Sequence, residues 1–181
     1  MIYLNGKTIE RADSTPKFPP ALAYAMVKKG IAGFDQCALY DPFCGKGTIV
    51  LIGGLNFSQI NKIYANDLDE EASIATEINL EKTNITNYLV SNENANSKII
   101  KDANLIVVTD PPFGRACEWE GSIDLFLENM TKQNVKRIVM CYDKNKKLDR
   151  TINNYFILKE KELIKDRFIY TIEIISKTPI L

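Results

Sequence analysis

Hydrophobic residues along this chain form short continuous runs that alternate with longer stretches of helical spacing. Short runs bounded by turn residues are typical of strands, whereas apolar positions repeating about every 3.6 residues are typical of helices. The clearest run, 105–109, is apolar on both faces, as expected of a central strand in a parallel sheet. We predict strands at 38–40, 62–66, 87–90, 105–109 and 136–141, and helices at about 19–30, 48–55, 69–80, 122–130 and 148–154.

The end of the chain follows a different pattern. Residues 156–177 alternate between apolar and polar positions, and the break at Lys165-Asp166 predicts a closing antiparallel hairpin. Strand–helix alternation that ends in such a hairpin indicates a Rossmann-like α/β fold, a three-layer sandwich around a mainly parallel, seven-stranded sheet. We expect a single domain over 1–181, with 1–16 as an N-terminal extension.

The predicted helix near residue 70 has a recognisable start. Asp69 suits the N-cap position, and Glu70 and Glu71 suit an acidic first turn, where they complement the helix dipole. Its apolar residues predict the face that packs on the sheet, which comprises Ala72, Ala75, Ile78 and Leu80.

Composition excludes several kinds of chemistry. The chain has no histidine, so Ser–His–Asp, Cys–His and histidine-ligated metal sites are all excluded. The four cysteines lack a CxxC pairing, which makes a zinc site or a disulfide framework improbable. No apolar run approaches the roughly 20 residues that a membrane-spanning helix needs. We therefore expect a cytoplasmic protein without a metal or a membrane partner.

Charge gives little support for nucleic acid binding on its own. The 23 basic and 23 acidic residues give a formal net charge of zero, so there is no global field to attract a polyanion. Any such partner must be bound by local clusters, such as 144–147 with Arg150, or Lys28-Lys29. Taken alone, each cluster is more simply explained as solvated surface.

A glycine loop, Tyr40-Asp-Pro-Phe-Cys-Gly-Lys-Gly-Thr48, leaves a predicted strand and enters a predicted helix. In this context a Gly-x-Gly pair brings the backbone close to a ligand. Asp67 ends the next strand, 20 residues after Gly47, where a carboxylate can accept hydrogen bonds from two ribose hydroxyls. The combination predicts a pocket for a nucleotide-like cofactor.

The loop departs from both phosphate-binding patterns. A dinucleotide fingerprint places a third glycine where Val50 stands, and a phosphate loop places a glycine where Tyr40 stands. Asp41 would repel a phosphate but suits a ligand with a cationic end. S-adenosyl-L-methionine carries a cationic amino group and a sulfonium and has no phosphate, so we predict it as the cofactor.

The two motifs together resemble those of a known family. Asp-Pro-Phe-Cys-Gly-x-Gly followed by Asp-Pro-Pro-Phe-Gly is similar to the signature pair of class I methyltransferases that act on nucleobases. More narrowly, the chain resembles the avilamycin-resistance type of 23S ribosomal RNA guanine methyltransferase. The segments that carry this resemblance are Phe18-Pro19, 40–47, 65–69, 108–114 and 119–121.

The resemblance implies roles around the cofactor. Asp41, Gly45 and Gly47 would contact its methionine end, and Asp67 its ribose. The acid that usually contacts adenine after the third strand is missing, and Asn92 or Asn94 is the candidate substitute. The remaining residues expected to line the cofactor pocket are Phe18, Pro19, Pro42, Cys44, Leu68 and Asp110.

The segment Asp110-Pro-Pro-Phe113 is the candidate reacting end. Two consecutive prolines continue neither a sheet nor a helix, so the backbone turns there. Asp110 and the carbonyl of Pro111 can each accept one N–H of an exocyclic amine, Pro112 helps to fix them, and Phe113 can stack on the base. Stacking would help offset the cost of extruding the base. Residues expected to border the target pocket are Gly114, Glu118, Trp119 and Glu120.

Two of these aromatic assignments have structural alternatives. Phe113 could belong to the core, although function is the better explanation, and Trp119 could equally be a packed anchor. Relatives of the type named above often have leucine in place of Pro111 and serine or threonine in place of Lys46. Pro111 favours an exocyclic amine (guanine N2, adenine N6 or cytosine N4) over a ring nitrogen. Lys46 has no assigned role.

The leading hypothesis is therefore an S-adenosylmethionine-dependent methyltransferase acting on an RNA base, a guanine of 23S ribosomal RNA, with a possible helper protein. A DNA or transfer RNA amino-methyltransferase is the alternative, disfavoured because such enzymes usually carry an additional recognition segment. An alternative of another class is a non-catalytic partner subunit that binds the cofactor, disfavoured by the intact acidic and glycine positions.

Overall fold

The structure, a computed structural model, describes residues 2–4, 7–9, 18–112, 122–143, 148, 155–164 and 167–175. β1 (Ile2–Leu4) and β2 (Lys7–Ile9) pair in an antiparallel two-stranded sheet of their own. The predicted helix at 148–154 lies outside the described residues apart from Leu148, which is buried.

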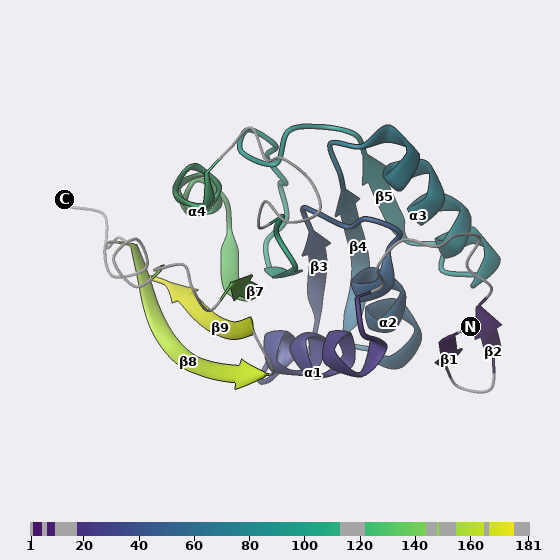
Figure 1. The fold of residues 1–181 in the computed structure, drawn as a ribbon, viewed down its shortest axis with the longest axis horizontal. Helices are drawn as coiled ribbons and strands as arrows, with labels where there is room; N and C mark the ends of the chain where they lie inside the picture. The colour runs from purple at the N-terminus through teal and green to yellow at the C-terminus, as the bar shows by residue number, and fades with distance from the viewer. Residues whose placement is uncertain are drawn as a thin grey trace.

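A seven-stranded sheet forms the centre of the protein (Figure 1). Its strand order is β5-β4-β3-β6-β7-β9-β8. The first five strands in this order are parallel, and β9 pairs antiparallel with both β7 and β8. This confirms the predicted Rossmann-like sheet and its antiparallel hairpin. The strands are β3 (Cys37–Asp41), β4 (Ile60–Asn66), β5 (Tyr88–Ser91), β6 (Leu105–Thr109), β7 (Val135–Asp143), β8 (Phe156–Ile164) and β9 (Arg167–Ile174).

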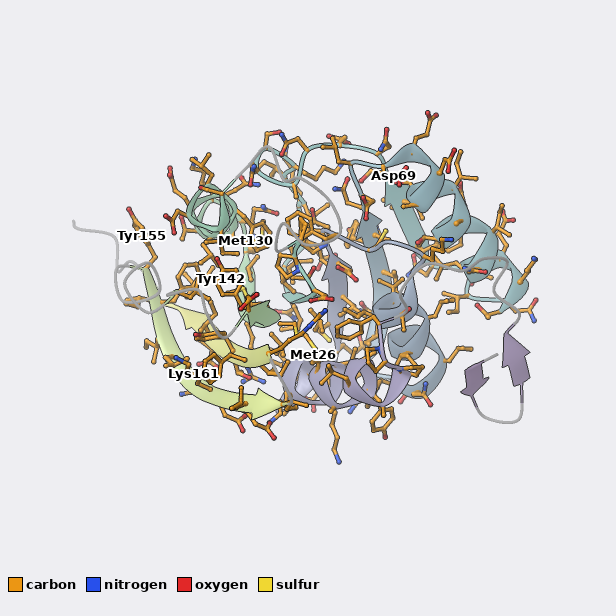
Figure 2. All side chains as sticks on the ribbon, viewed as in Figure 1. Met26, Asp69, Met130, Tyr142, Tyr155 and Lys161 are labelled. Carbon is orange, nitrogen blue, oxygen red and sulfur yellow. The ribbon has the colours of Figure 1, made fainter. Side chains whose placement is uncertain are left out.

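Helices cover both faces of this sheet and create two apolar cores. Met26 of α1 belongs to the core on one face, and Met130 of α4 to the core on the other, together with Tyr142 (Figure 2). β3 and β6 are buried along their whole length, which confirms the prediction of a central strand at 105–109. No helix in the described part of the chain has the length and apolar character needed to cross a membrane. The helices are α1 (Pro20–Ile31), α2 (Thr48–Asn56), α3 (Glu70–Lys82) and α4 (Ile123–Thr131).

Local signals in the sequence set the helix ends. Proline occupies the first turn of α1, where a missing N–H costs nothing, and Lys28 and Lys29 lie in its last turn, where they complement the dipole. The Asp69 side chain accepts a hydrogen bond from the backbone N–H of Glu71, as predicted for an N-cap. The Ser122 hydroxyl caps α4 in the same way, through the backbone N–H of Leu125.

The packing face predicted for α3 is confirmed at Leu80, which is buried, and wrong at Ile78. Ile78 was expected to point inward from α3, but its side chain is 43% exposed. The buried residues of α3 are instead mostly polar: Ser73, Thr76, Asn79 and Leu80. The reason is that α3 packs against loop backbone, whose carbonyl groups need hydrogen-bond donors rather than apolar side chains.

The topology brings the carboxyl ends of β3 and β6 together. β3 lies between β4 and β6, and Leu39 is in register with Ile106, as Tyr40 is with Val107. The chain runs from β3 to β4 and β5 on one side and then crosses to β6 on the other. Loops diverge at such a switch point and leave a crevice where ligands bind in open α/β sheets. Asp41 and Asp110, which end or follow these strands, therefore lie at the same edge.

Candidate active site

The glycine loop joins β3 to α2 in an unusual backbone conformation. Gly47 is the N-cap of α2 and adopts a left-handed conformation with φ of 84°, and Gly45 has φ of 52°. The Gly47 N–H donates to the Cys44 carbonyl at 2.8 Å, which closes the turn. A Cβ atom on Gly47 would lie 3.1 Å from the Thr76 side chain. Both the conformation and the space therefore favour glycine at 47.

The polar face of α3 holds this loop from behind. The Thr76 hydroxyl donates to the Gly45 carbonyl at 2.8 Å, and the Asn79 amide donates to the Lys46 carbonyl at 3.1 Å. The Cys44 thiol lies 3.5 Å from the Thr76 hydroxyl and is buried, which raises its pKa well above the usual value. These contacts fix the carbonyls of Gly45 and Lys46 against α3 and so hold the conformation of the loop.

Asp41 is enclosed where β3 ends. Its side chain is 1% exposed, and its Oδ1 accepts from the Thr109 hydroxyl at 2.7 Å and from the Phe43 N–H at 3.2 Å. Burial raises the pKa of Asp41 to about 7, against the opposing effect of these two hydrogen bonds. The negative charges of Asp67 and Asp110 raise it further. The three acids thus interact electrostatically at one edge of the sheet.

Asp67 follows β4 and faces the glycine loop. Its Oδ2 accepts from the Gly45 N–H at 2.8 Å, and its Oδ1 accepts from the Asp69 N–H at 3.1 Å. Burial raises the pKa of Asp67, and the hydrogen bonds from these backbone groups oppose the shift. Leu68 beside it is 57% exposed, an apolar side chain at the surface next to the predicted ribose ligand.

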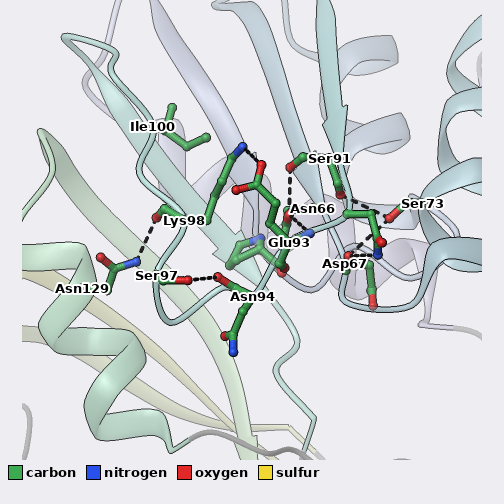
Figure 3. Close-up of polar contacts among 12 residues, drawn as sticks. Asn66, Asp67, Ser73, Ser91, Glu93, Asn94, Ser97, Lys98, Ile100 and Asn129 are labelled. Atoms are coloured by element: carbon green, nitrogen blue, oxygen red, sulfur yellow. Dashed lines mark hydrogen bonds and ion pairs between the residues drawn. The ribbon is translucent and has the colours of Figure 1, made fainter.

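Asn66 ends β4 and connects the glycine loop with the end of β5 and the segment that follows it (Figure 3). It is fully buried, and its amide nitrogen donates to the carbonyls of Pro42 at 3.2 Å and Glu93 at 2.8 Å. Its oxygen accepts from the Ser91 hydroxyl at 2.7 Å and from the Glu93 N–H at 3.1 Å. One side chain thereby ties the glycine loop to the segment that follows β5.

The structure distinguishes the two asparagines considered for the adenine end. The Asn92 amide donates to the carbonyls of Asp67 at 2.9 Å and Leu68 at 2.8 Å. Asn94 instead accepts from the Asn96 N–H at 2.9 Å within its own loop. Asn92 is thus the one that contacts the segment of the predicted ribose ligand, while contact of either residue with adenine stays a prediction.

Asp110 lies directly after β6 and forms an ion pair that no sequence pattern predicts. The Arg167 Nη1 atom, from the start of β9, lies 2.9 Å from its Oδ1 and 2.7 Å from its Oδ2. Burial raises the pKa of Asp110, while the charge and hydrogen bonds of Arg167 act in the opposite direction. Pro111 is buried and Pro112 half-buried, so the backbone after Asp110 is enclosed.

Several predicted site residues cannot be placed. The assignments to Phe113, Gly114, Glu118, Trp119 and Glu120 lie outside the described residues, as does the basic cluster at 144–147. Phe18 packs against the core that contains α1, and exposed Pro19 is the N-cap of that helix. Their contact with a cofactor stays a prediction. Within the described ranges, no group of three or more acidic, cysteine or histidine side chains is arranged to hold a metal.

Sequence reasoning missed Asn66, Thr76, Thr109 and Arg167. Asn66 immediately precedes Asp67 at a strand end, a position where a polar side chain among apolar neighbours was a usable signal. Thr76 and Thr109 had no such signal, because threonine is common in both helices and strands. Arg167 reaches Asp110 across 57 positions, and only the tertiary structure brings them together.

The site residues fit S-adenosylmethionine. The buried Asp41 carboxylate lacks a described cationic partner and would gain from the cofactor's ammonium. The loop at Gly45 leaves open space, with nothing within 4 Å of where a Cβ would stand, so a ligand can approach the backbone. Asp67 retains lone pairs for the ribose hydroxyls beyond the two hydrogen bonds that it already accepts.

Fold and site together define a class I methyltransferase, in which a seven-stranded sheet with an antiparallel end positions a glycine loop and strand-end acids. Residues 11–167 match the family model of the RMKL-like methyltransferase domain, UPF0020, and the chain belongs to this family. The chain is thus a methyltransferase domain of this family, and its sheet has the class I arrangement.

Solved structures of low sequence identity share the fold. TrmN from Thermus thermophilus superposes with a TM-score of 0.70 at 20% identity, over 86% of this chain and 49% of that one. An Escherichia coli protein, yhhF, assigned provisionally as a methyltransferase, superposes with a TM-score of 0.74 at 17% identity, over 95% and 94% of the two chains. These likenesses establish the architecture.

Sequence relatives come from archaea. The chain is 29% identical over 162 residues to the tRNA (guanine(10)-N2)-dimethyltransferase of Methanocaldococcus jannaschii, which covers 83% of this chain and 45% of the relative. It is 31% identical over 103 residues to the enzyme of the same name from Methanothermobacter thermautotrophicus, covering 56% of this chain and 29% of the relative. The chain therefore spans less than half the length of these relatives.

Proposed function

We propose that this protein transfers a methyl group from S-adenosylmethionine to the exocyclic N2 amine of a guanine in transfer RNA. The observation that carries the proposal is the position of Asp110 and Pro111 at the switch point, directly beside the acidic cofactor site of Asp41. We take guanine as the base and transfer RNA as the substrate from the names of the archaeal relatives.

The comparisons favour a different RNA from the one expected. Ribosomal RNA was the leading hypothesis, and transfer RNA was set aside because such enzymes usually carry an additional RNA-capture domain. That argument has no force here, since the chain covers only 45% of a relative that is named as a transfer RNA enzyme. The avilamycin-resistance type is likewise not the type found among these relatives.

We assign the cofactor end to three groups. Asp41 would bind the ammonium, the backbone at Gly45 would lie against the methionine end, where a Cβ would meet nothing within 4 Å, and Asp67 would accept from the ribose hydroxyls. Leu68 offers an exposed apolar surface to the adenine beside it. When bound, the cofactor supplies an electrophilic methyl group on sulfur.

We assign the reacting end to Asp110 and the Pro111 carbonyl. The guanine N2 lone pair is delocalised into the ring, so the amine is a poor nucleophile. Two acceptors that each take one N–H favour a pyramidal nitrogen whose lone pair points at the methyl carbon. The amine nitrogen would take the methyl group as its bond to the cofactor sulfur breaks, and the proton that the methylated nitrogen must lose would pass to the Asp110 carboxylate, which already accepts its hydrogen bond. Alignment of this kind can supply about 7–11 kcal/mol of the barrier.

The experiment is methyl transfer to transfer RNA that differs by one amine. A transcript with guanine at position 10 is compared with one that carries inosine there, because inosine lacks only the N2 amine. Labelled methyl groups are counted, and mass spectrometry identifies the modified nucleoside. We expect N2-methylated guanosine from the first transcript and no product at position 10 from the second.

Large-subunit ribosomal RNA and duplex DNA serve as competing substrates in the same assay. Equal labelling of the inosine transcript would contradict N2 as the target, and labelling of ribosomal RNA alone would contradict transfer RNA as the substrate. Cofactor binding without transfer to any nucleic acid would favour the non-catalytic subunit or a required helper protein.

A further inference from the structure

Arg167 and Asp110 lie on different strands and meet at the crevice edge. Arg167 opens β9, opposite Asp143 at the end of β7, and its Nη1 atom contacts both carboxylate oxygens of Asp110 at 2.9 and 2.7 Å. The same nitrogen lies 3.9 Å from the Cys141 Sγ atom, on the strand between them. The β8–β9 hairpin therefore places a positively charged side chain at the reacting end of the site.

Burial disfavours a charged Asp110 carboxylate, and apart from Arg167 the hydrogen bond with the Cys141 side chain is the interaction that favours it. Asp41 lies at the end of the neighbouring strand β3 and interacts unfavourably with it, and Asp143 ends β7 on the far side. The Cys141 thiol packed between the strands stays neutral, since burial raises its pKa to about 12. Among the described residues, Arg167 is the positive group that is in contact with Asp110.

We propose that Arg167 is a positioning residue for methyl transfer, which holds the Asp110 side chain as a fixed, charged hydrogen-bond acceptor for the substrate amine. This inference rests on the proposed function, because it takes Asp110 as the acceptor. It adds a residue from the C-terminal hairpin, 57 positions away from the Asp-Pro-Pro motif, to the reacting end.

The geometry leaves Asp110 able to act. A carboxylate has about four acceptor positions, and one nitrogen that bridges both oxygens occupies only one side of the group. Even with a second acceptor position used by the Cys141 side chain, the carboxylate keeps lone pairs for a substrate N–H. Because buried Pro111 fixes the backbone next to it, the carboxylate is restrained from both its ends.

The test compares three variants of the full chain. Arg167→Gln removes the cation, and Arg167→Lys keeps a positive charge that can reproduce the single-nitrogen contact. Arg137→Gln is the matched control, because Arg137 pairs with Glu173 across the same β7–β9 ladder but at its other end. Each variant is assayed for kcat/KM against pH with transfer RNA and for cofactor affinity by calorimetry.

We expect Arg167→Gln to move the acidic limb of the pH profile upward by about one unit, because an adjacent arginine lowers a carboxyl pKa by roughly that much or more. At a fixed pH on the acidic limb, a shift of one unit lowers kcat/KM about tenfold. The affinity of Arg167→Gln for the cofactor should change less than twofold. The pH profile of Arg167→Lys should lie close to that of the wild type. Arg137→Gln should leave the acidic limb of the profile where it is in the wild type.

A second measurement is independent of substrate. Titration of the Asp110 carboxyl carbon by NMR in the wild type and in Arg167→Gln should show a higher pKa in the variant. An unchanged Asp110 titration, or an identical pH profile in Arg167→Gln and Arg137→Gln, would overturn the inference. Absence of transfer by the wild type would count against the proposed function, as set out above, and the NMR result would still decide the role of Arg167.

Discussion

Asp41 combines two requirements that oppose one another. Burial favours its neutral form and raises its pKa to about 7, whereas a cationic ligand needs the charged form. The hydrogen bonds from Thr109 and Phe43 reduce this conflict but do not remove it. Proton release from Asp41 should therefore accompany cofactor binding near neutral pH.

We predict that affinity for S-adenosylmethionine rises with pH through this range. The charged fraction of a group with a pKa of about 7 increases roughly eightfold between pH 6 and pH 7.5, and affinity should follow it. The rise should flatten toward pH 7.5, because an α-amino group with a pKa of about 7.7–8.0 has lost roughly a third of its protons there. Calorimetry at several pH values provides the measurement.

The paired variants for this prediction are Asp41→Asn and Asp69→Asn. Asp41→Asn should bind about tenfold or more weakly and lose the pH dependence, because a buried charge partner has been removed. Asp69→Asn keeps a good N-cap next to the site and should behave as wild type. Persistence of the full pH dependence in Asp41→Asn would show that another group controls it.

Among elements, α3 shows how a helix can support a loop rather than a core. Its buried side chains Thr76 and Asn79 donate to carbonyls of the glycine loop, while Ile74 and Ile78 face outward. A loop with left-handed glycines exposes more unpaired carbonyls than a regular strand end, and each needs a donor when it is buried. The polar face of α3 meets this requirement.

We predict that Gly47→Ala destabilises the protein more than Gly33→Ala. Both glycines have φ of 84°, so the left-handed penalty of about 1–2 kcal/mol applies equally. Only Gly47 would also bring a Cβ within 3.1 Å of Thr76, whereas nothing lies within 4 Å at Gly33. Chemical denaturation measures the difference, and cofactor affinity should fall only in Gly47→Ala. Equal destabilisation by Gly47→Ala and Gly33→Ala would mean that the Thr76 side chain moves away from the new Cβ without a free-energy penalty.

The sequence predicted those elements whose signals are local. The proline start of α1, the Asp69 cap and the fully apolar strand at 105–109 each depend on neighbouring residues, and the structure has all three. The break at 165–166 correctly separated β8 from β9. Local reasoning therefore sufficed for the order and type of these elements.

Local reasoning failed where a partner decides the outcome. Ile78 fits an apolar helix face in the sequence, but the loop beneath α3 demands donors, so the helix turns its polar side inward. The four hydrogen bonds of Asn66 link segments that the sequence separates, and the ion pair of Arg167 does the same. Glycine spacing and the spaced acid located the cofactor site, but the residues that hold it in place needed the fold.

For the molecule as a whole, the clustered acids make stability depend on pH. Burial raises the pKa values of Asp41, Asp67 and Asp110 above their usual range. A group whose pKa is raised on folding stabilises the fold below its unfolded pKa and loses this contribution as pH rises through its folded pKa. The cofactor-free protein should therefore lose part of its stability between about pH 4 and pH 7.

We predict that the free energy of unfolding of the wild type, relative to Asp41→Asn, falls across this range. The shift from 3.8 to about 7 corresponds to at most about 4 kcal/mol. Urea denaturation of both proteins from pH 4 to pH 8 isolates the contribution of this one group. Cofactor at about 100 times its Kd should raise the free energy of unfolding by about 2.7 kcal/mol at neutral pH. A difference that does not vary with pH would exclude Asp41 as a destabilising charge.

The strand order also governs how the chain is made. β3 is fully buried between β4 and β6, but β6 begins only at Leu105, so residues 42–104 must be synthesised before that side of β3 has a partner. At about 5–20 residues per second, the nascent chain displays an open apolar edge for several seconds. That side of β3 therefore stays unpaired while the helices and strands between it and β6 are made, and an unpaired apolar strand edge of this kind is prone to aggregation.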